Sequence, residues 1–201
     1  NFIIILVWRE KGGFDVVIGN PPYVLLQDKY DDKIALKFFK SNYSIASYKI
    51  DLYHLFFEKA CNLKNHYGSV IYITPTNYQS NNYSKDLRKH LLKNNLNHIV
   101  VLEGSIFKAS VNTSITHLVL KQDQKVKFDK AILNSHNNLT INEVAEVPFS
   151  FFETDDILFI PPLNKDAARI LEIITRKNNK SLKSISEINF GMQLRNRKHH
   201  P

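Results

Sequence analysis

The chain has 201 residues, of which 43% are hydrophobic and 11% aromatic, and this composition excludes a disordered tail because it can fill a core in one domain. A single cysteine, Cys61, excludes a disulfide framework and a multi-cysteine metal site and favours a reducing compartment, so we expect the protein in the cytoplasm. The net charge of +8 is uneven, because residues 176–201 hold seven Lys or Arg against one acid; this pattern is typical of a phosphate-binding segment and equally of a solvated tail.

Two strands are predicted near the N-terminus. The apolar run Phe2–Trp8 is far shorter than the roughly 20 residues that span a bilayer. It also lacks the flanks of a signal peptide, so we expect a buried strand there. The run Phe14–Gly19 is rich in β-branched residues, which is typical of a strand buried on both faces of a parallel sheet. Since the chain begins at Asn1 and its only methionine is Met192, we expect a further part of the protein upstream.

The next segments alternate between helix and strand. Apolar residues recur at helical spacing from Asp51 to Lys64, with Asp51 as candidate N-cap, and from Ser84 to Asn94, with Ser84 as candidate N-cap. The runs Ser69–Thr74 and Leu96–Leu102 are expected to be strands. Together with the first strand, this order predicts an α/β sheet joined by parallel crossovers.

The remaining third of the chain has weaker signals. Two strand-like runs, 113–120 and 125–133, are separated by a short polar stretch and resemble a hairpin. The Asn-rich stretch 134–142 is expected to be a surface loop. Residues 165–176 are expected to form a helix.

Four residues, Asn20-Pro21-Pro22-Tyr23, follow directly on the predicted strand. This position is the carboxyl end of a parallel strand, where open α/β sheets bind ligands. Each proline fixes φ at about −65° and lacks an N–H, so the loop is stiff and its carbonyls can accept hydrogen bonds. A plain turn is the alternative interpretation, because Asn-Pro often starts turns.

The loop could prepare an amine for methylation. The exocyclic amine of adenine shares its lone pair with the ring, so it is planar and a poor nucleophile. The Asn20 side-chain oxygen and the Pro21 carbonyl could each accept one of its hydrogens, draw the nitrogen toward tetrahedral geometry and free the lone pair for direct attack on a methyl group. Tyr23 offers an aromatic face on which a flipped-out base can stack, a contact worth about 1–3 kcal/mol.

The segment Phe14–Val24, which contains this loop, resembles the catalytic motif of adenine-specific (N6) DNA methyltransferases of the TaqI-like, type II (IIG) restriction-modification family. The resemblance continues at Asp51-Leu52-Tyr53, at Tyr72-Ile73-Thr74-Pro75 and at Gly104-Ser105-Ile106-Phe107, and it is good over residues 14–121 and loose beyond. It implies an α/β fold: the second half of a Rossmann-like methyltransferase sheet, mostly parallel, with a terminal antiparallel hairpin. The implied reaction transfers a methyl group from S-adenosyl-L-methionine to the amine of a flipped-out adenine.

The same resemblance assigns roles to individual residues. Phe107 would stack on the adenine face opposite Tyr23, and Phe56 would line the cofactor pocket with Asn20 and Pro21. Helical spacing alone places Phe56 in the core, and Phe107 without the resemblance is also interpreted as core. No metal site is implied. The basic residues that could contact DNA phosphates are Arg195, Arg197 and Lys198.

The resemblance also implies a domain plan and partners. Residues 1–133 would form the second half of the catalytic domain, and residues 134–201 would lead into a target-recognition domain that the chain does not cover. The implied partners are double-stranded DNA and a fused or separate endonuclease, with no membrane involved.

Other functions compete with this interpretation. A protein glutamine methyltransferase faces the same chemical problem in a carboxamide nitrogen, although an aromatic at Phe107 and a basic C-terminal segment suit a flipped base better. A non-catalytic DNA-binding remnant is a further alternative. Asn rather than Ser at position 20 disfavours an N4-cytosine methyltransferase, and Cys61, in a predicted helix, does not suit cytosine-C5 chemistry.

One departure from the family concerns the cofactor. The family binds S-adenosylmethionine through a glycine-rich loop upstream of the catalytic loop, but none of the six glycines of this chain forms a Gly-x-Gly pair. We therefore expect an incomplete fragment of a methyltransferase domain.

From this departure we predict that the chain by itself binds S-adenosylmethionine weakly or not at all. Isothermal titration calorimetry with the purified chain measures this directly. A dissociation constant in the micromolar range would contradict the prediction.

Overall fold

The computed structural model describes residues 3–8, 12–26, 33–46, 49–103, 112–120, 124–133, 138–153, 157–160, 162 and 164–176. Elements labelled η are short 3-10 helices. In chain order the elements are β1 (Ile3–Trp8), β2 (Phe14–Asn20), α2 (Lys33–Asn42), α3 (Leu52–Leu63), β3 (Lys64–Pro75), η1 (Thr76–Gln79), η2 (Asn82–Ser84), α4 (Lys85–Lys93), β4 (Leu96–Glu103), β5 (Thr113–Leu118), β6 (Lys125–Leu133), β7 (Leu139–Pro148), η3 (Phe149–Phe152) and α5 (Lys165–Arg176). Across these described segments, each helix is too short or too polar to cross a lipid bilayer.

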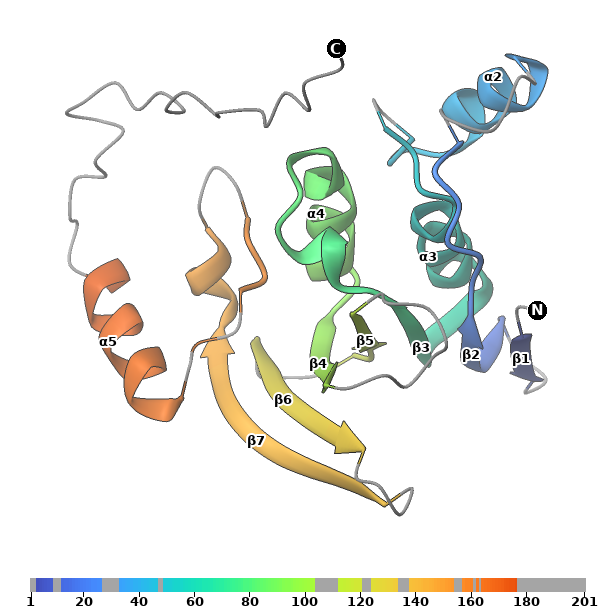
Figure 1. Cartoon of the computed structure of the whole chain (residues 1–201). Helices are drawn as coiled ribbons and strands as arrows, with labels where there is room; N and C mark the ends of the chain where they lie inside the picture. The colour runs from blue at the N-terminus through green and yellow to red at the C-terminus, as the bar shows by residue number, and fades with distance from the viewer. Residues whose placement is uncertain are drawn as a thin grey trace, which may run out of the picture.

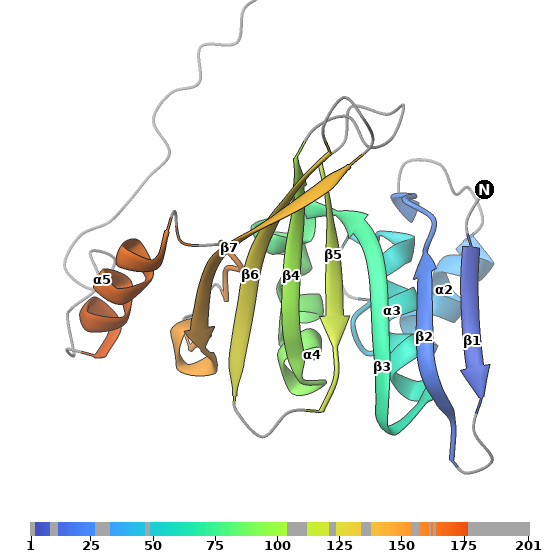
Figure 2. The same ribbon diagram turned by 90° about the horizontal axis from the view of Figure 1, so that it is seen from below.

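The strands form one sheet in the order β1-β2-β3-β5-β4-β6-β7, with α3 and α4 on one face (Figures 1 and 2). The predicted alternation from β2 through α3, β3 and α4 to β4 is confirmed. The sheet is more mixed than expected, however. The pairs β2–β3 and β4–β6 are parallel, and the other described pairs are antiparallel.

The predicted hairpin between residues 113–120 and 125–133 is wrong, because β4 lies between β5 and β6. The antiparallel hairpin at the end of the sheet instead joins β6 to β7. The expected loop at 134–142 is therefore also too long, since β7 begins at Leu139. The strand accommodates Asn142 because the first residues of β7 are exposed, whereas Val144, Ala145 and Val147 are buried farther along.

The N-terminal strands are less buried than their sequences predict. Strand β1 forms as expected, but it lies at the edge of the sheet, and Ile5, Leu6 and Val7 are all exposed. In β2, Val17 is buried while the neighbouring Ile18 is 38% exposed. The reason is that α3 and α4 pack on only one face of the sheet, so side chains alternate between a covered and an open side.

The main core lies between the sheet and this helical layer. Helix α3 contributes Leu55 and Phe57 to it, and α4 contributes Leu87 and Leu91. Asp51 and Ser84 occupy the predicted N-cap positions, but neither side chain makes a capping hydrogen bond. Helix α4 is followed by Asn95 at φ 61°, a left-handed conformation that asparagine adopts more readily than most residues after a helix.

A buried arginine connects this core to the later part of the chain. Arg88 on α4 is 1% exposed, and its guanidinium donates hydrogen bonds to the Tyr78 and Asn81 carbonyls, each at 2.7 Å. Its Nε donates to the carbonyl of Ile157, which has φ 49°, an unusual value for a β-branched residue. Arg88 therefore holds a strained backbone segment against η1 and η2.

We predict that Arg88→Ala lowers the free energy of unfolding by about 3 kcal/mol or more, because three carbonyls lose charge-assisted hydrogen bonds inside the core. Urea denaturation followed by circular dichroism measures the loss. Lys89→Ala, at the exposed neighbouring position on α4, serves as control and should change stability by less than about 0.5 kcal/mol. Equal effects of the two substitutions would contradict this account of Arg88.

Candidate active site

The loop at Asn20–Tyr23 leaves the sheet where two parallel strands end together. Gly19 of β2 is in register with Tyr72 of β3, so Asn20 comes to the end of its strand beside Ile73. Pro21 is buried, while Tyr23 is 37% exposed. The expectation that this loop lies at the carboxyl end of a parallel strand is therefore confirmed.

The chain after the loop is fixed against the start of α3. Leu26 donates its backbone N–H to the Ile50 carbonyl at 2.9 Å, and Leu52 donates to the Val24 carbonyl at 2.9 Å. Between these two bonds, Leu25 forms an antiparallel bridge with Asp51. These contacts bring the first turn of α3 next to the loop.

Tyr23 is held in place by two contacts. Its hydroxyl donates to the Ile73 carbonyl at 3.1 Å, and its ring meets the ring of Tyr53 edge-on, with 6.3 Å between centroids and 83° between planes. Burial raises the pKa of Tyr23 to about 12, so the phenol stays uncharged at neutral pH. The ring thus presents a neutral, fixed face at the edge of the sheet.

Asn20 carries an acceptor that lacks a partner. Its Oδ1 is buried and makes no hydrogen bond with the described residues. Such an unpaired polar atom costs about 1–3 kcal/mol in a folded protein. The Tyr53 hydroxyl and the Thr74 hydroxyl, which lie at the same edge on α3 and β3, are also buried without a described partner.

Asn20 also borders a hollow of about 310 Å³ on the open face of the sheet. Ile18 and Ile71 point into this hollow, because they alternate along their strands with Val17 and Val70 of the main core. The lining is almost entirely aliphatic. The lining residues are Ile5, Ile18, Gly19, Asn20, Ile71, Ile73 and Ile115.

The first turn of α3 forms a buried layer beneath Tyr23. The Tyr53 ring packs edge-on against His54 at 4.6 Å between centroids, and both side chains are 1% exposed. Burial raises the pKa of Tyr53, and the carboxylate of Asp51 adds to this effect. Burial, with the positive charge of Arg88, lowers the pKa of His54 to about 3, so His54 is neutral at physiological pH.

The remaining predicted site residues do not all fall within the described structure. Phe56 lies on α3, half-buried against the main core. The predicted stacking partner Phe107 and the predicted phosphate-binding residues Arg195, Arg197 and Lys198 lie outside the described residues. The structure therefore places Asn20, Pro21 and Tyr23 at the end of β2, and the roles of all the predicted site residues remain predictions.

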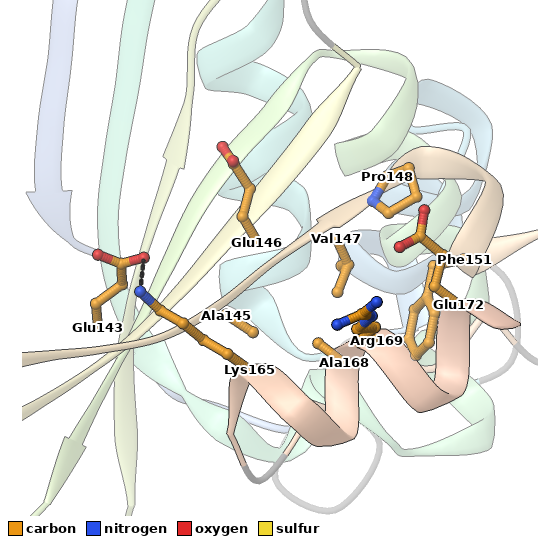
Figure 3. A pocket seen from close by; sticks show the side chains of 10 residues that line it. All are labelled: Glu143, Ala145, Glu146, Val147, Pro148, Phe151, Lys165, Ala168, Arg169 and Glu172. Carbon is orange, nitrogen blue, oxygen red and sulfur yellow. Dashed lines mark ion pairs between the residues drawn. The ribbon is translucent and has the colours of Figure 1, made fainter.

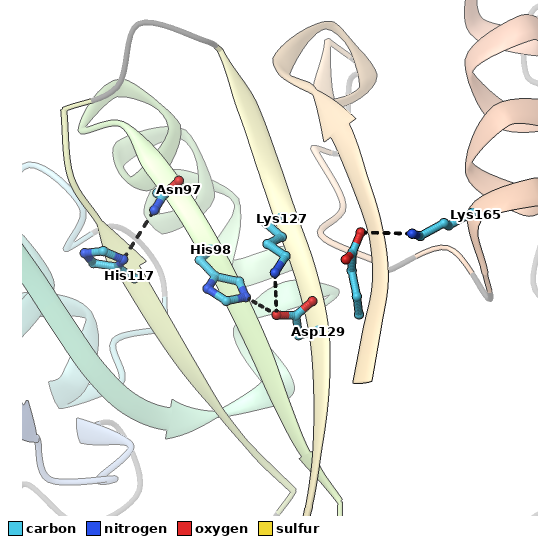
Figure 4. A network of polar contacts seen from close by, with 7 residues as sticks. Asn97, His98, His117, Lys127, Asp129 and Lys165 are labelled. Atoms are coloured by element: carbon cyan, nitrogen blue, oxygen red, sulfur yellow. Dashed lines mark hydrogen bonds and ion pairs between the residues drawn. The ribbon is translucent and has the colours of Figure 1, made fainter. Parts of the chain in front are cut away.

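Two further polar regions lie away from the loop. A hollow of about 290 Å³ between β7 and α5 is lined by charged side chains, among which Lys165 and Glu143 form an ion pair at 3.2 Å (Figure 3). On β4 and β6, the buried Asp129 carboxylate contacts His98 at 2.8 Å and Lys127 at 3.1 Å (Figure 4). Neither region contains a predicted site residue, and the described residues hold no group of three or more His, Cys, Asp or Glu suited to a metal ion.

Solved structures establish the class of fold. The chain is similar to a modification subunit ascribed to a type I restriction enzyme from Vibrio vulnificus YJ016, with a TM-score of 0.50 and 16% sequence identity over 87% of this chain and 40% of that chain. At this identity the likeness concerns the fold alone. The predicted fold class, an α/β sheet of the Rossmann-like methyltransferase type, is thereby confirmed.

The sequence then identifies the family. Residues 2–107 match the family described as Eco57I restriction-modification methylase, and because this is more than half of the chain, the chain belongs to that family. The type II methyltransferase M.AccI of Acinetobacter calcoaceticus is 29% identical over 79% of this chain and 30% of its own length. The type II restriction enzyme and methyltransferase RM.Eco57I of Escherichia coli is 28% identical over 66% of this chain and 12% of its own length. The chain spans less than a third of either relative.

Sequence reasoning did not identify Tyr53 as part of the site. Helical spacing places Leu52 and Leu55 in the core and predicts a neighbouring face for Tyr53. The pairing of residues 24–26 with residues 50–52 decides its position, because it turns the start of α3 toward the loop. The resemblance of the segment Asp51-Leu52-Tyr53 to the family was the one sequence signal that could have pointed to Tyr53.

The neutral His54 predicts a pH dependence of stability. The folded chain does not protonate His54 until about pH 3, whereas the unfolded chain takes up this proton near pH 6.5. The contribution to stability is therefore complete above pH 6.5 and is lost as the pH falls toward 3, by at most about 1.4 kcal/mol per pH unit.

Urea denaturation between about pH 7 and pH 5 measures this slope. We expect His54→Gln to flatten it, because the variant has no imidazole to protonate on unfolding. His66→Gln, at an exposed position, is the control and should keep the wild-type slope. An unchanged slope in the His54 variant would show that another group controls it.

Proposed function

We propose that this chain carries the amine-binding part of the active site of a DNA adenine-N6 methyltransferase of a restriction-modification system. The observation that supports this most directly is the buried Oδ1 of Asn20 at the end of β2, which has no hydrogen-bond partner among the described residues. A folded chain retains such an acceptor at a cost, which is understandable where a substrate supplies the hydrogen. Family membership gives the methyl-transfer chemistry.

In this mechanism two acceptors prepare the target amine. The Oδ1 of Asn20 accepts one hydrogen of the adenine amine, and the carbonyl of Pro21 accepts the other. Both acceptors lie on a loop stiffened by Pro21 and Pro22, so little reorganisation is needed when the base arrives. The nitrogen lone pair is thereby withdrawn from the ring and becomes nucleophilic.

Tyr23 would position the base by stacking. Its ring is accessible, uncharged and fixed between the Ile73 carbonyl and the edge of Tyr53. A rigid aromatic face suits a flipped-out base because stacking then costs little side-chain entropy. We assign the opposite face of the base to Phe107, which follows β4 in the sequence.

S-adenosyl-L-methionine supplies an electrophilic methyl group when it is bound. Phe56 on α3, together with Asn20 and Pro21, would border it on the side of the target amine. The described residues supply acceptors for the target amine. They do not supply a glycine-rich loop for this cofactor, since the chain contains no Gly-x-Gly pair whose backbone could come close to it. We therefore assign to this chain the preparation of the amine and no role in holding the cofactor's nucleoside.

The remaining assignments follow from the same proposal. Double-stranded DNA is the substrate, and Arg195, Arg197 and Lys198 would contact its phosphates. Residues 1–133 belong to the catalytic domain and residues 134–201 lead toward target recognition. An endonuclease, fused or separate, is a further partner, as the name of RM.Eco57I combines both activities. The single cysteine Cys61 suits the cytoplasm.

A protein glutamine methyltransferase remains the main alternative, because Asn20 and Pro21 could prepare a carboxamide nitrogen in the same way. A methylation assay that offers duplex DNA and a protein substrate in parallel separates the two. A chain that binds DNA but takes part in methylating neither substrate would be a non-catalytic remnant.

We predict that Asn20→Ala, in the complete enzyme that contains this chain, abolishes detectable methyl transfer because it removes one of the two acceptors. Transfer of a labelled methyl group from S-adenosylmethionine to duplex DNA measures this. Asn97→Ala is a matched control, since Asn97 on β4 also has a buried Oδ1 without a described partner but lies away from the loop. Near-normal turnover of the Asn20 variant with unchanged DNA binding would refute the mechanism.

A further inference from the structure

Helix α2 is joined to α3 through its partly buried side and through the residues that follow it. Its side chains Leu36 and Phe39 pack against the main core, as does Tyr43 just after it. The carboxylate of Glu58 on α3, which is 7% exposed, accepts hydrogen bonds from the backbone N–H groups of Ser44 at 2.9 Å and Ile45 at 3.1 Å. The end of α2 is therefore fixed to the helix that carries Tyr53.

The outward side of α2 is basic. Lys33, Lys37 and Lys40 are exposed, and the helix contains no acidic residue. Figure 1 shows α2 beyond α3, farther from the sheet. Ile34 is 82% exposed and Phe38 is 56% exposed; each follows a lysine by one residue, so together they form an apolar strip beside the lysines.

The spacing of these lysines suits the backbone of a nucleic acid. Positions 33, 37 and 40 repeat at intervals that put them on one side of a helix, over a length of about 10 Å. One strand of duplex DNA carries a phosphate for about every 3.4 Å of its axis, so about three phosphates fall within that length. The exposed Phe38 can then contact the sugars or base edges between them.

The charge of the rest of the molecule favours the same side. Residues 33–46 and 49–93, which contain α2, α3 and α4, hold ten Lys or Arg against three carboxylates. Residues 138–153 and 164–176, which contain β7 and α5 at the opposite end of the sheet, hold three against five. Three acids, Asp28, Asp31 and Asp32, and one base, Lys29, precede α2 in the sequence, outside the described residues. A polyanion is therefore attracted to the helical layer near the loop and away from the β7 edge.

We propose that the outward face of α2, formed by Lys33, Ile34, Lys37, Phe38 and Lys40, binds the DNA backbone next to the flipped-out base. The proposal rests on the proposed function, since it takes DNA as the substrate. Nine residues separate Tyr23 from Lys33, and the segment after α2 is bound to Glu58 on α3, the helix that also carries Tyr53, so the proposal places the phosphates next to the flipped-out base on α2. The face thus fixes where the duplex lies relative to Asn20.

The test compares two double variants of the full chain for binding to a short DNA duplex of mixed sequence. Lys33→Ala/Lys37→Ala removes two charges from α2. Lys89→Ala/Lys93→Ala removes two exposed lysines at the same spacing from α4. The C-terminal end of α4 leads to the start of β4, at the end of the sheet opposite to the Asn20–Tyr23 loop. Fluorescence anisotropy between about 50 and 200 mM salt gives the affinity and its salt dependence.

We expect the α2 variant to bind about tenfold more weakly at about 100 mM salt, with a slope of log affinity against log salt reduced by about 2, because each phosphate contact contributes about 0.9 to the slope. The α4 variant should match the wild type. Lys33→Arg/Lys37→Arg should restore wild-type binding, since the charge is kept. Thermal unfolding of all variants confirms that they are folded.

Equal affinity and slope in the α2 variant and the wild type would overturn the proposal, as would an equal loss in the α4 variant. Failure of the proposed function gives a different result. In that case Asn20→Ala retains methyl transfer in the complete enzyme, whatever the α2 variant does. If the proposed function holds, Asn20→Ala loses transfer but keeps DNA binding, and the α2 variant loses DNA binding.

Discussion

The parallel pairing of β2 with β3 sets the position of each described group at the candidate site. This register ends β2 at Asn20 beside Ile73, whose carbonyl is then available to the Tyr23 hydroxyl. A shift by one residue would move Asn20 to the other face of the sheet, because side chains alternate along a strand. The short pairing between residues 24–26 and 50–52 completes the arrangement by placing Tyr53 under Tyr23.

These contacts leave the site with buried polar atoms that have no hydrogen-bond partner in the described part of the chain. Asn20, Tyr53 and Thr74 each contribute one such buried atom at the same edge of the sheet. Three other atoms of this kind, on His90, Asn97 and Asp129, lie on α4, β4 and β6, away from the loop. The gathering of three such atoms near the loop suits a binding site, since groups that recognise a substrate cannot be fully committed to the protein beforehand.

Local patterns were sufficient for the elements that surround the loop. Strands β2 and β4 and helices α3 and α4 were each predicted close to their observed bounds. Each prediction depends only on residues near one another in the sequence: the β-branched run of β2, the helical spacing of α3 and α4 and the apolar run of β4. The Asn20–Tyr23 loop was found because its position after a strand is also a local property. Its chemical role remains a proposal.

The parts that sequence could not supply depend on contacts between distant segments. The insertion of β5 between β3 and β4 is decided by pairing across the sheet, and the sequence between β5 and β6 looks like a hairpin turn in either case. Burial of β1 was overestimated for the same reason, because an apolar strand does not reveal whether it lies at an edge. Tyr53 was overlooked because its neighbours at residues 23–26 are far away in the chain.

The guanidinium of Arg88 connects the helical layer to the segment at residue 157. It holds the Ile157 carbonyl in a conformation that a β-branched residue does not adopt readily, and it does so from the helix that packs beneath His54 and Tyr53. Phe159, two residues later, is anchored by its own backbone bond to the Gln79 carbonyl at 2.9 Å. Residues 157 and 159 are thus fixed to the same helical layer whose Tyr53 supports Tyr23, so the later part of the chain and the loop share one foundation in the core.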